Sequence, residues 1–535
     1  MVIDARGLSE ADELEADVCI VGAGPAGISI ALELARVGCE VCLVESGGRE
    51  PEAEAQKLNE GVSVGYWYYP LAATRVRAFG GTSAHWFVAK ADEVDGWRTR
   101  PLDPVDFETR PGIPHSGWPF GLAELQPFYE RAQELCRLGP YEYTPSRWET
   151  EGAQTLALDG RIGTRVFQHG FENFVLYFDE LARARKVKLV LHASALEVET
   201  DASAGRVVRL IVGRPFPGTF SVRARVYVLA AGGIENARLL LLSNRSQPSG
   251  LGNQEDLVGR FFMEKLSGRV GFIAPENPDL LGRVSLYLQH MVGATSVQAA
   301  FSPTNEVVRE ERLLNCAFFL VPHYRASASE GVRSAATLYR ALRRRPLPDA
   351  LSGHARNVIT GLDDIARIAY RKLRNGAEHE ILALRVQAEQ APNPDSRVTL
   401  DAKRDRFGLP RARLDWRITE LDRWSIRRAQ EILDDALKAA GLGHVEHKLG
   451  DEEPPSLFLG NFHHIGTTRM HEDGRRGVVD PNCQVHGVSN LFVAGSSVFP
   501  TSGYANPTLT IVALALRLAE HLRTTLGARS AGLPR

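Results

Sequence analysis

The 535-residue sequence has few cysteines and no long uninterrupted apolar run. Its six cysteines form no metal-ligand cluster, so no metal site is expected. Cys39 and Cys42 form a C-x-x-C pair, but they flank a predicted buried strand, and this favours packing over redox chemistry. No apolar run reaches the ~18 residues that a membrane-spanning helix needs, so no transmembrane segment is expected.

Charge of one sign is also lacking. The formal net charge of −2 provides no overall field that would attract nucleic acid or a membrane, so neither is expected as a partner. The first residues are acidic and lack the charged-then-apolar pattern of a signal peptide. With 44% hydrophobic and 24% charged residues, the composition is that of an ordinary globular protein of one to three domains. We therefore expect a reduced, cytoplasmic protein.

Residues 16–45 predict a strand, a glycine-rich turn, a helix and a second strand. Strand patterns return at 187–200, 206–213 and 221–233, and a helical pattern follows the last of them. Near residue 255 the character changes to short apolar strands alternating with long helical patterns. From residue 456 the chain returns to strand, loop and helix, so the first domain is expected to be built from two separate pieces.

A helical and basic segment spans residues 325–374. It contains eleven Arg and Lys residues against four acidic ones. The segment is interpreted as a solvated helical insertion; the alternative is a surface for an anionic partner, for membrane headgroups or for a neighbouring subunit.

The turn after the first strand reads Gly22-Ala23-Gly24-Pro25-Ala26-Gly27, a dinucleotide-binding fingerprint in its proper strand-to-helix context. Gly22 permits the tight turn, Gly24 lets the backbone approach a pyrophosphate, and Gly27 lets helix and strand pack closely. The helix N-terminus, with Pro25 and Ala26, offers free N–H groups to phosphates. Glu45 ends the second strand 21 residues after Gly24, where a carboxylate can bind ribose hydroxyls.

The nucleotide favoured is FAD. Strand 221–233 ends in a second glycine-rich crossing, which a nicotinamide enzyme would not need. A disulfide reductase would show a paired redox cysteine motif and a second complete fingerprint, and the sequence has neither.

Residues 461–510 bring together a histidine pair, a Gly-Thr turn, a strand ending in Gly-Ser and an Asn-Pro-Thr helix start. With these pieces the chain resembles the glucose–methanol–choline (GMC) family of FAD oxidoreductases. The resemblance is carried by GAGPAG with Glu45, FGGTSAHW (79–86), VLAAGGIENARLLL (229–242), EQAPNPDSRVTL (389–400), HHIGTTRM (463–470) and NLFVAGSSVFPTSGYANPTLT (490–510).

The resemblance implies that His463 is the catalytic base and Asn506 its partner in the oxidation of an alcohol, with hydride passing to the flavin. A neutral imidazole suits the proton transfer, and the helix start at Asn506 can stabilise negative charge on the flavin. His464 is expected to pack or hydrogen-bond away from the flavin. Further flavin contacts are implied for Gly80, Gly81, Thr82, Ser83, His85, Trp86, Ala231, Gly232, Gly495, Ser496, Asn506, Pro507 and Thr508.

Three features of the site remain open. In one branch of the family a Ser-x-His-Trp carries a covalent histidine–flavin bond, and Ser83-Ala84-His85-Trp86 fits it; the alternative is non-covalent packing of His85. The aromatic residues 66–69 form either a lid or stacking platform for sugar rings, or part of the core. Residues 263–265 depart from the family, and Lys265 is given no role.

The overall prediction is an α/β protein: a doubly wound, Rossmann-like FAD-binding domain (1–254 and 456–535) with an inserted α+β substrate-binding domain (255–455). The expected substrate is a pyranose, glycoside, aminoglycoside-type sugar or cyclitol, and oxygen or another acceptor reoxidises the flavin. An oligomer is possible. The alternatives are a non-redox lyase of the same family, oxidation of a non-sugar alcohol, or a flavin-bound binding protein; intact His463 and Asn506 argue against the last.

Overall fold

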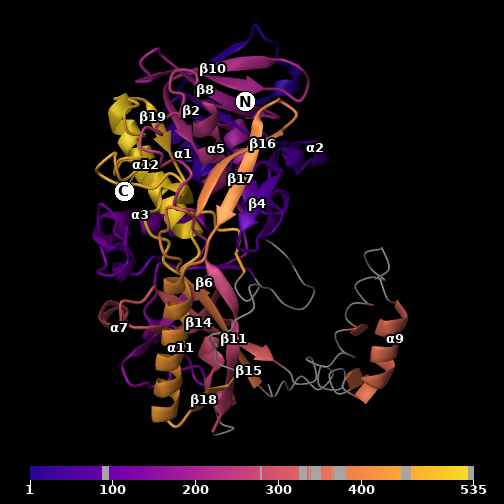
Figure 1. Cartoon of the computed structure of the whole chain (residues 1–535), viewed down its shortest axis with the longest axis vertical. Helices are drawn as coiled ribbons and strands as arrows, with labels where there is room; N and C mark the ends of the chain where they lie inside the picture. The colour runs from indigo at the N-terminus through magenta and orange to yellow at the C-terminus, as the bar shows by residue number, and fades with distance from the viewer. Residues whose placement is uncertain are drawn as a thin grey trace.

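The computed structural model describes residues 1–86, 96–276, 280–323, 351–363, 381–446 and 459–527, together with residues 334, 335, 338, 365 and 366. In this part of the chain two sheets are stacked along the long axis of the molecule (Figure 1). The upper sheet is mostly parallel and the lower sheet is antiparallel. One hydrophobic core runs through both, because Val18 of the upper sheet and Leu384 of the lower sheet belong to the same buried cluster.

The upper sheet has the strand order β1-β7-β3-β2-β10-β9-β8, with β19 beside β10. The bounds are β1 (Val2–Asp4), β2 (Glu13–Val21), β3 (Val41–Val44), β7 (Val187–Leu191), β8 (Ser194–Thr200), β9 (Val207–Gly213), β10 (Thr219–Leu229) and β19 (Leu491–Val493). All pairs from β1 to β10, and β10 with β19, are parallel, and β8 and β9 add an antiparallel edge. All four residues of β3 are buried, as expected for a parallel strand covered on both faces.

Helices complete the upper part. They are α1 (Pro25–Arg36), α2 (Ala53–Gln56), α3 (Leu122–Leu135), α4 (Phe178–Arg183), α5 (Gly232–Leu242) and α12 (Thr508–Leu526). The last of them, α12, packs against both α1 and α3, so the C-terminal helix lies between elements from the first quarter of the chain. Both the N-terminus and α12 lie in the upper half of Figure 1.

The lower sheet has the order β18-β11-β15-β14-β13-β6-β5, with β12 beside β13. Its strands are β5 (Trp97–Thr99), β6 (Ile162–Gly170), β11 (Leu266–Pro275), β12 (His290–Val292), β13 (Thr295–Pro303), β14 (Cys316–His323), β15 (Ile381–Ala388) and β18 (Gly443–Glu446). The helices nearby are α6 (Leu280–Arg283), α7 (Asn305–Glu310) and α11 (Glu420–Ala439). A capping box of Thr419 and Asp422 begins α11, whose apolar face lies on the sheet.

A small third sheet joins β16 (Arg397–Arg404) and β17 (Pro410–Trp416) to β4 (Gly61–Gly65). It lies beside the upper sheet, since β16 and β17 contact α5. The α/β class with a Rossmann-like domain and a sheet-rich second domain is confirmed. The domain limits remain a prediction. Strands β5 and β6 lie within residues 1–254, which the prediction assigns to the FAD-binding domain, but they pair in the lower sheet.

The basic segment 325–374 falls mostly outside the described residues. Its described part contains α9 (Leu351–Thr360), which stands apart from both sheets in Figure 1. Within the described ranges, no helix combines the length and apolarity needed to cross a bilayer. All six cysteines are buried and free.

Candidate active site

The glycine-rich turn has the geometry that a dinucleotide site requires. Gly22 adopts φ +103°, and a Cβ there would lie 2.6 Å from the carbonyl oxygen of Ala230 on the neighbouring strand. A Cβ on Gly27 would lie 2.0 Å from the carbonyl oxygen of Gly22, so only glycine lets α1 pack this closely. Gly24, in contrast, faces open space, with no atom within 4 Å of an added Cβ. The open position lies at the N-terminus of α1, where a phosphate can approach free N–H groups.

Glu45 is buried at the end of β3 and is held by the turn. Its Oε2 accepts a hydrogen bond from the N–H of Ala23 at 2.9 Å, and its Oε1 accepts one from the N–H of Gly47 at 2.9 Å. Burial raises the pKa of Glu45, and these backbone hydrogen bonds act against that rise. The carboxylate is thereby fixed beside Gly22, with lone pairs left for hydroxyl groups.

A cavity begins at this turn and is lined by residues from both ends of the chain. The predicted site residues that line it are Gly22, Gly24, Pro25, Ala26, Glu45, Gly81, Thr82, Ser83, Trp86, Ala231, Gly232, His463, Gly495, Ser496, Pro507 and Thr508. Gly27 and Gly80 are predicted site residues that do not line this cavity. His85 and Asn506 line an adjoining cavity, which shares Thr82, Trp86, His463 and Thr508 with the first.

The segment 79–86 lies against the glycine-rich turn. The N–H of Gly80 donates to the carbonyl of Ala23 at 2.8 Å, and a Cβ on Gly81 would lie 3.0 Å from the Cα of Gly24. The buried Ser83 hydroxyl donates to the carbonyl of Gly80 at 2.6 Å and accepts from the N–H of Phe174 at 3.2 Å. The hydroxyl therefore holds its own loop, and the contact of Ser83 with the cofactor stays a prediction.

His463 lies where the two cavities meet. Its Nδ1 is buried and has no hydrogen-bond partner in the part of the chain that the structure describes. Burial holds the pKa of His463 well below its usual value, and the positive charge of Lys265 acts in the same direction. The imidazole is thus neutral near pH 7, with a ring nitrogen available to accept a proton.

Asn506 has a fixed amide. Its Oδ1 accepts from Nε2 of Gln387 at 2.6 Å, and its Nδ2 donates to the carbonyl of Arg98 at 2.8 Å. Gln387 is itself fixed, because its Oε1 accepts from Arg98 at 2.9 Å and its Nε2 also donates to the carbonyl of Tyr504 at 2.6 Å. An amide nitrogen carries two hydrogens, so Asn506 keeps one N–H for a group in the cavity.

His464 lines the first cavity beside His463, but its ring is hydrogen-bonded to the core. It is buried, and its Nε2 lies 2.9 Å from the hydroxyl of Tyr68. Among the aromatic residues 66–69, Tyr68 is 7% exposed and belongs to the core, whereas Trp67 is 49% exposed. The aromatic stretch therefore divides between core and surface.

The sequence-based prediction missed an arginine cluster in the first cavity. Arg75 and Arg77 line this cavity beside Glu235, and the carboxylate of Glu235 forms an ion pair with each of them. Burial opposes the charge on Glu235, but Arg77, Arg75 and Arg238 together hold its pKa well below its usual range. The two arginines stand shortly before the Gly80-Gly81 pair, and that proximity to the predicted flavin loop was the available signal.

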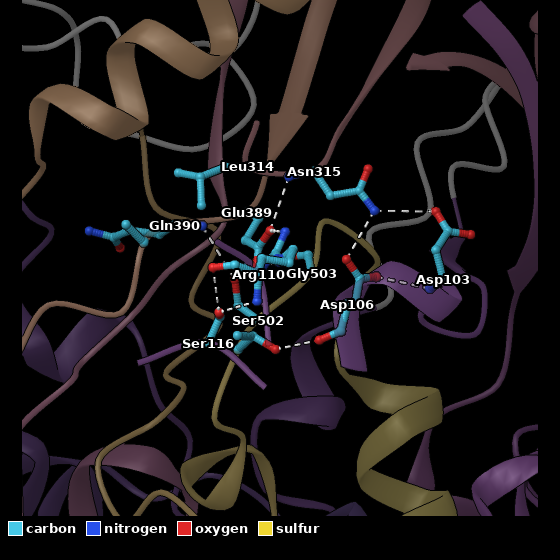
Figure 2. A network of polar contacts seen from close by, with 12 residues as sticks. Asp103, Asp106, Arg110, Ser116, Leu314, Asn315, Glu389, Gln390, Ser502 and Gly503 are labelled. Carbon is cyan, nitrogen blue, oxygen red and sulfur yellow. Dashed lines mark hydrogen bonds and ion pairs between the residues drawn. The ribbon is translucent and has the colours of Figure 1, made fainter. Parts of the chain in front are cut away.

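A buried ionic network lies beside Ser502 and Gly503, which precede Asn506 in the chain (Figure 2). Arg110 donates to both oxygens of Glu389, at 2.8 and 2.6 Å. The carboxylate of Glu389 also accepts from the N–H of Asn315 at 3.0 Å, and the Asn315 side chain donates to Asp106 at 2.9 Å. Burial raises the pKa of Asp106 to about 7, with Glu389 and Asp103 adding to the rise.

In the described ranges, no group of acidic, histidine or cysteine side chains is arranged to hold a metal ion.

The cavity residues fit FAD. Open space faces Gly24, Gly232 and Gly495, so a ligand can lie against the backbone at all three. A carboxylate, a helix N-terminus and two arginines line the same cavity, and these groups match the ribose and phosphates of a dinucleotide.

Comparison with known protein families also indicates an FAD-dependent enzyme. A family model described as FAD dependent oxidoreductase matches residues 17–361, and one described as GMC oxidoreductase matches residues 392–515. The chain belongs to the FAD-dependent oxidoreductases of the GMC family.

Individual relatives differ in how much of the chain they match. 6'''-hydroxyparomomycin C oxidase of Streptomyces lividus is 26% identical over 96% of this chain and 92% of its own length. C-glycoside 3-oxidase of Arthrobacter globiformis is 40% identical, but over only 25% of this chain and 26% of its own. Among solved structures, a formate oxidase superposes with a TM-score of 0.56 at 16% identity, covering 96% of this chain and 99% of that one, which shows a shared fold.

Proposed function

We propose that the protein oxidises a hydroxyl group of a sugar-like substrate to a carbonyl, with His463 as the catalytic base and Asn506 as its partner. The observation that carries the proposal is the position of the buried, neutral imidazole of His463 at the junction of the dinucleotide cavity and the adjoining one that contains Asn506. When bound, FAD supplies the hydride acceptor.

His463 takes the proton of the substrate hydroxyl. Its neutral imidazole can accept this proton near pH 7, and an alkoxide is a far better hydride donor than the alcohol. Asn506 directs its remaining N–H at the same oxygen and holds it while negative charge develops there. Pro507 and Thr508 begin α12, whose N-terminal N–H groups favour negative charge in the neighbouring cavity.

A sugar-like substrate is supported by the names of several relatives, which include paromamine 6'-oxidase, fructose dehydrogenase large subunit and pyranose 2-oxidase. The electron acceptor is oxygen or another oxidant. The six buried, free cysteines support a reducing compartment such as the cytoplasm.

Anaerobic addition of substrate tests the proposal. We expect one class among sugars, glycosides, aminoglycosides and cyclitols to bleach the flavin absorbance near 450 nm, because hydride transfer reduces the flavin. Spectra from 300 to 550 nm measure this, and admitting air then tests oxygen as the acceptor. A flavin that no alcohol in the panel bleaches would count against sugar oxidation and favour a lyase; a protein that purifies without flavin would contradict the cofactor.

The attachment of the flavin is a separate question. His85 lines the cavity that contains His463, and its side chain is exposed there, so it is accessible for a covalent bond. We expect acid precipitation to retain yellow colour in the pellet if that bond forms, and H85A to release the colour. Complete release from the unmodified protein would exclude the bond and leave non-covalent packing.

A further inference from the structure

Two adjacent residues, Glu264 and Lys265, lie between the two loops that carry His463 and Asn506. The chain at 263–267 runs antiparallel to 459–465, with backbone hydrogen bonds between Met263 and Ile465 at 2.9 and 3.0 Å. Both side chains are fully buried. Charged groups are rarely buried unless paired or hydrogen-bonded, so each must be compensated by its contacts.

Glu264 contacts the loop of His463. Its Oε2 accepts from the N–H of His463 at 3.0 Å and from the N–H of Asn461 at 3.1 Å. Between these two residues stands Phe462 with φ +62°, a left-handed conformation that is uncommon for a bulky residue. One carboxylate oxygen thus holds the backbone on both sides of a strained residue, directly at the base.

Lys265 contacts the opposite loop. Its Nζ donates to the carbonyl oxygens of Ser502 and Gly503 at 2.5 and 2.6 Å. Gln387 donates to the next carbonyl oxygen, that of Tyr504, and to the side chain of Asn506. Hydrogen-bond donors therefore fix three successive carbonyl groups ahead of Asn506. Burial lowers the pKa of Lys265 to about 7, while Asp106, Glu389 and Glu264 favour its charged form.

We propose that Glu264 and Lys265 are positioning residues: Glu264 orients His463, and Lys265 orients Asn506, from adjacent positions just before β11. The inference rests on the proposed function of His463 and Asn506. It gives a role to the position where the sequence departs from the GMC pattern and where no role was expected.

Hydrogen–deuterium exchange tests, without substrate, whether Glu264 and Lys265 each hold a different loop. In E264Q, we expect backbone exchange to rise at least tenfold in 459–465 and to stay unchanged in 502–508. In K265M, we expect the reverse, because two buried carbonyls lose their donor. The matched control is K438M, which removes an exposed lysine of α11 whose Nζ lies 2.8 Å from Asp434; we expect no change in either loop. Wild-type exchange of both loops in E264Q and K265M would overturn the proposal.

Rates of flavin reduction test the functional consequence. With whichever panel compound reduces the wild-type flavin, we expect E264Q and K265M each to lower the limiting rate on the order of 10²-fold at full flavin content, the loss typical of a small misplacement of catalytic groups. E264Q should add little to the loss in H463A, and K265M little to the loss in N506A, whereas E264Q and N506A should be closer to additive. The pair K265M and H463A does not serve as a crossed control, because the charge of Lys265 also acts on His463. Losses that simply add in the first two pairs contradict the proposed roles.

Two results separate this inference from the function on which it rests. Normal flavin reduction in H463A would refute the proposed function, whatever the exchange data show. Normal reduction in E264Q and K265M, with slow reduction in H463A, would refute only the positioning roles. If K265M does not accumulate, K265R replaces it, because a larger, planar guanidinium cannot take the place of the compact ammonium group buried against both carbonyls; a wild-type rate there also overturns the proposal.

Discussion

Replacing His463 with alanine is expected to leave the flavin bound but to slow its reduction by a factor on the order of 10²–10⁴, the usual contribution of a general base. The side chain lies at the junction of two cavities, and its neutral imidazole can accept a hydroxyl proton. Stopped-flow absorbance under anaerobic conditions measures the rate. A variant that reduces its flavin as fast as the wild type would refute the assignment of His463 as the base.

His169 offers a matched control for that variant. It is also a buried histidine with an unpartnered Nδ1 in the described structure, and burial lowers its pKa to about 3. It lies in β6 of the lower sheet and lines neither of the two cavities. H169A should therefore reduce its flavin within about twofold of the wild-type rate, and this separates loss of the base from loss of a buried imidazole.

The pH dependence follows from the same group. A base must be neutral to act, and burial holds the pKa of His463 well below its usual value. Protonation of His463 should therefore cause no decline in the rate of flavin reduction as pH falls through the ordinary histidine value of about 6.5, and should lower the rate only at lower pH. Lys265 and Asp106, whose pKa values are about 7, titrate in the same range, so the profile is also measured in K265M. A decline centred at or above about 6.5 that persists in K265M would mean that the imidazole is not shifted in the direction that its burial predicts.

The second large effect is expected in stability. Glu389→Ala should lower the free energy of unfolding by about 3–5 kcal/mol, because it leaves the Arg110 guanidinium buried without its partner. The side chains of this pair are 4% and 0% exposed, and the carboxylate also serves Asn315 (Figure 2). Urea unfolding followed by circular dichroism measures the loss.

An exposed pair of the same type provides the comparison. Arg309 donates to both oxygens of Glu108 at 2.9 and 2.7 Å, but the two side chains are 42% and 38% exposed. Glu108→Ala should cost less than about 1 kcal/mol. Equal losses in the two variants would show that burial does not decide the strength of the effect, and would contradict the interpretation of the network.

How much of this could be predicted depends on how local each feature is. The β2-turn-α1-β3 unit was predictable, because Gly22, Gly24 and Gly27 lie within six residues; the structure shows close backbone contacts at Gly22 and Gly27 and open space at Gly24. The place of β5 and β6 was not, since strand patterns do not state which sheet a strand joins.

The contacts around the base and its partner were hidden for the same reason. Gln387 and Asn506 are 119 residues apart, and Glu264 and His463 are 199 apart. An isolated glutamine or glutamate in a sequence gives no sign of such a partner. The side chain of Lys265 was read as a departure from a pattern, whereas its burial against two carbonyl groups appears only in three dimensions.

The docking of α12 between α1 and α3, and of β19 beside β10, has a consequence for biogenesis. A ribosome releases residues 491–526 long after α1 and α3, so the apolar sides of those helices wait uncovered while more than three hundred further residues are made. The nucleotide cavity also lacks its wall from Gly495 and Ser496 during that interval. Loading of the flavin is therefore expected to follow synthesis of the C-terminal segment.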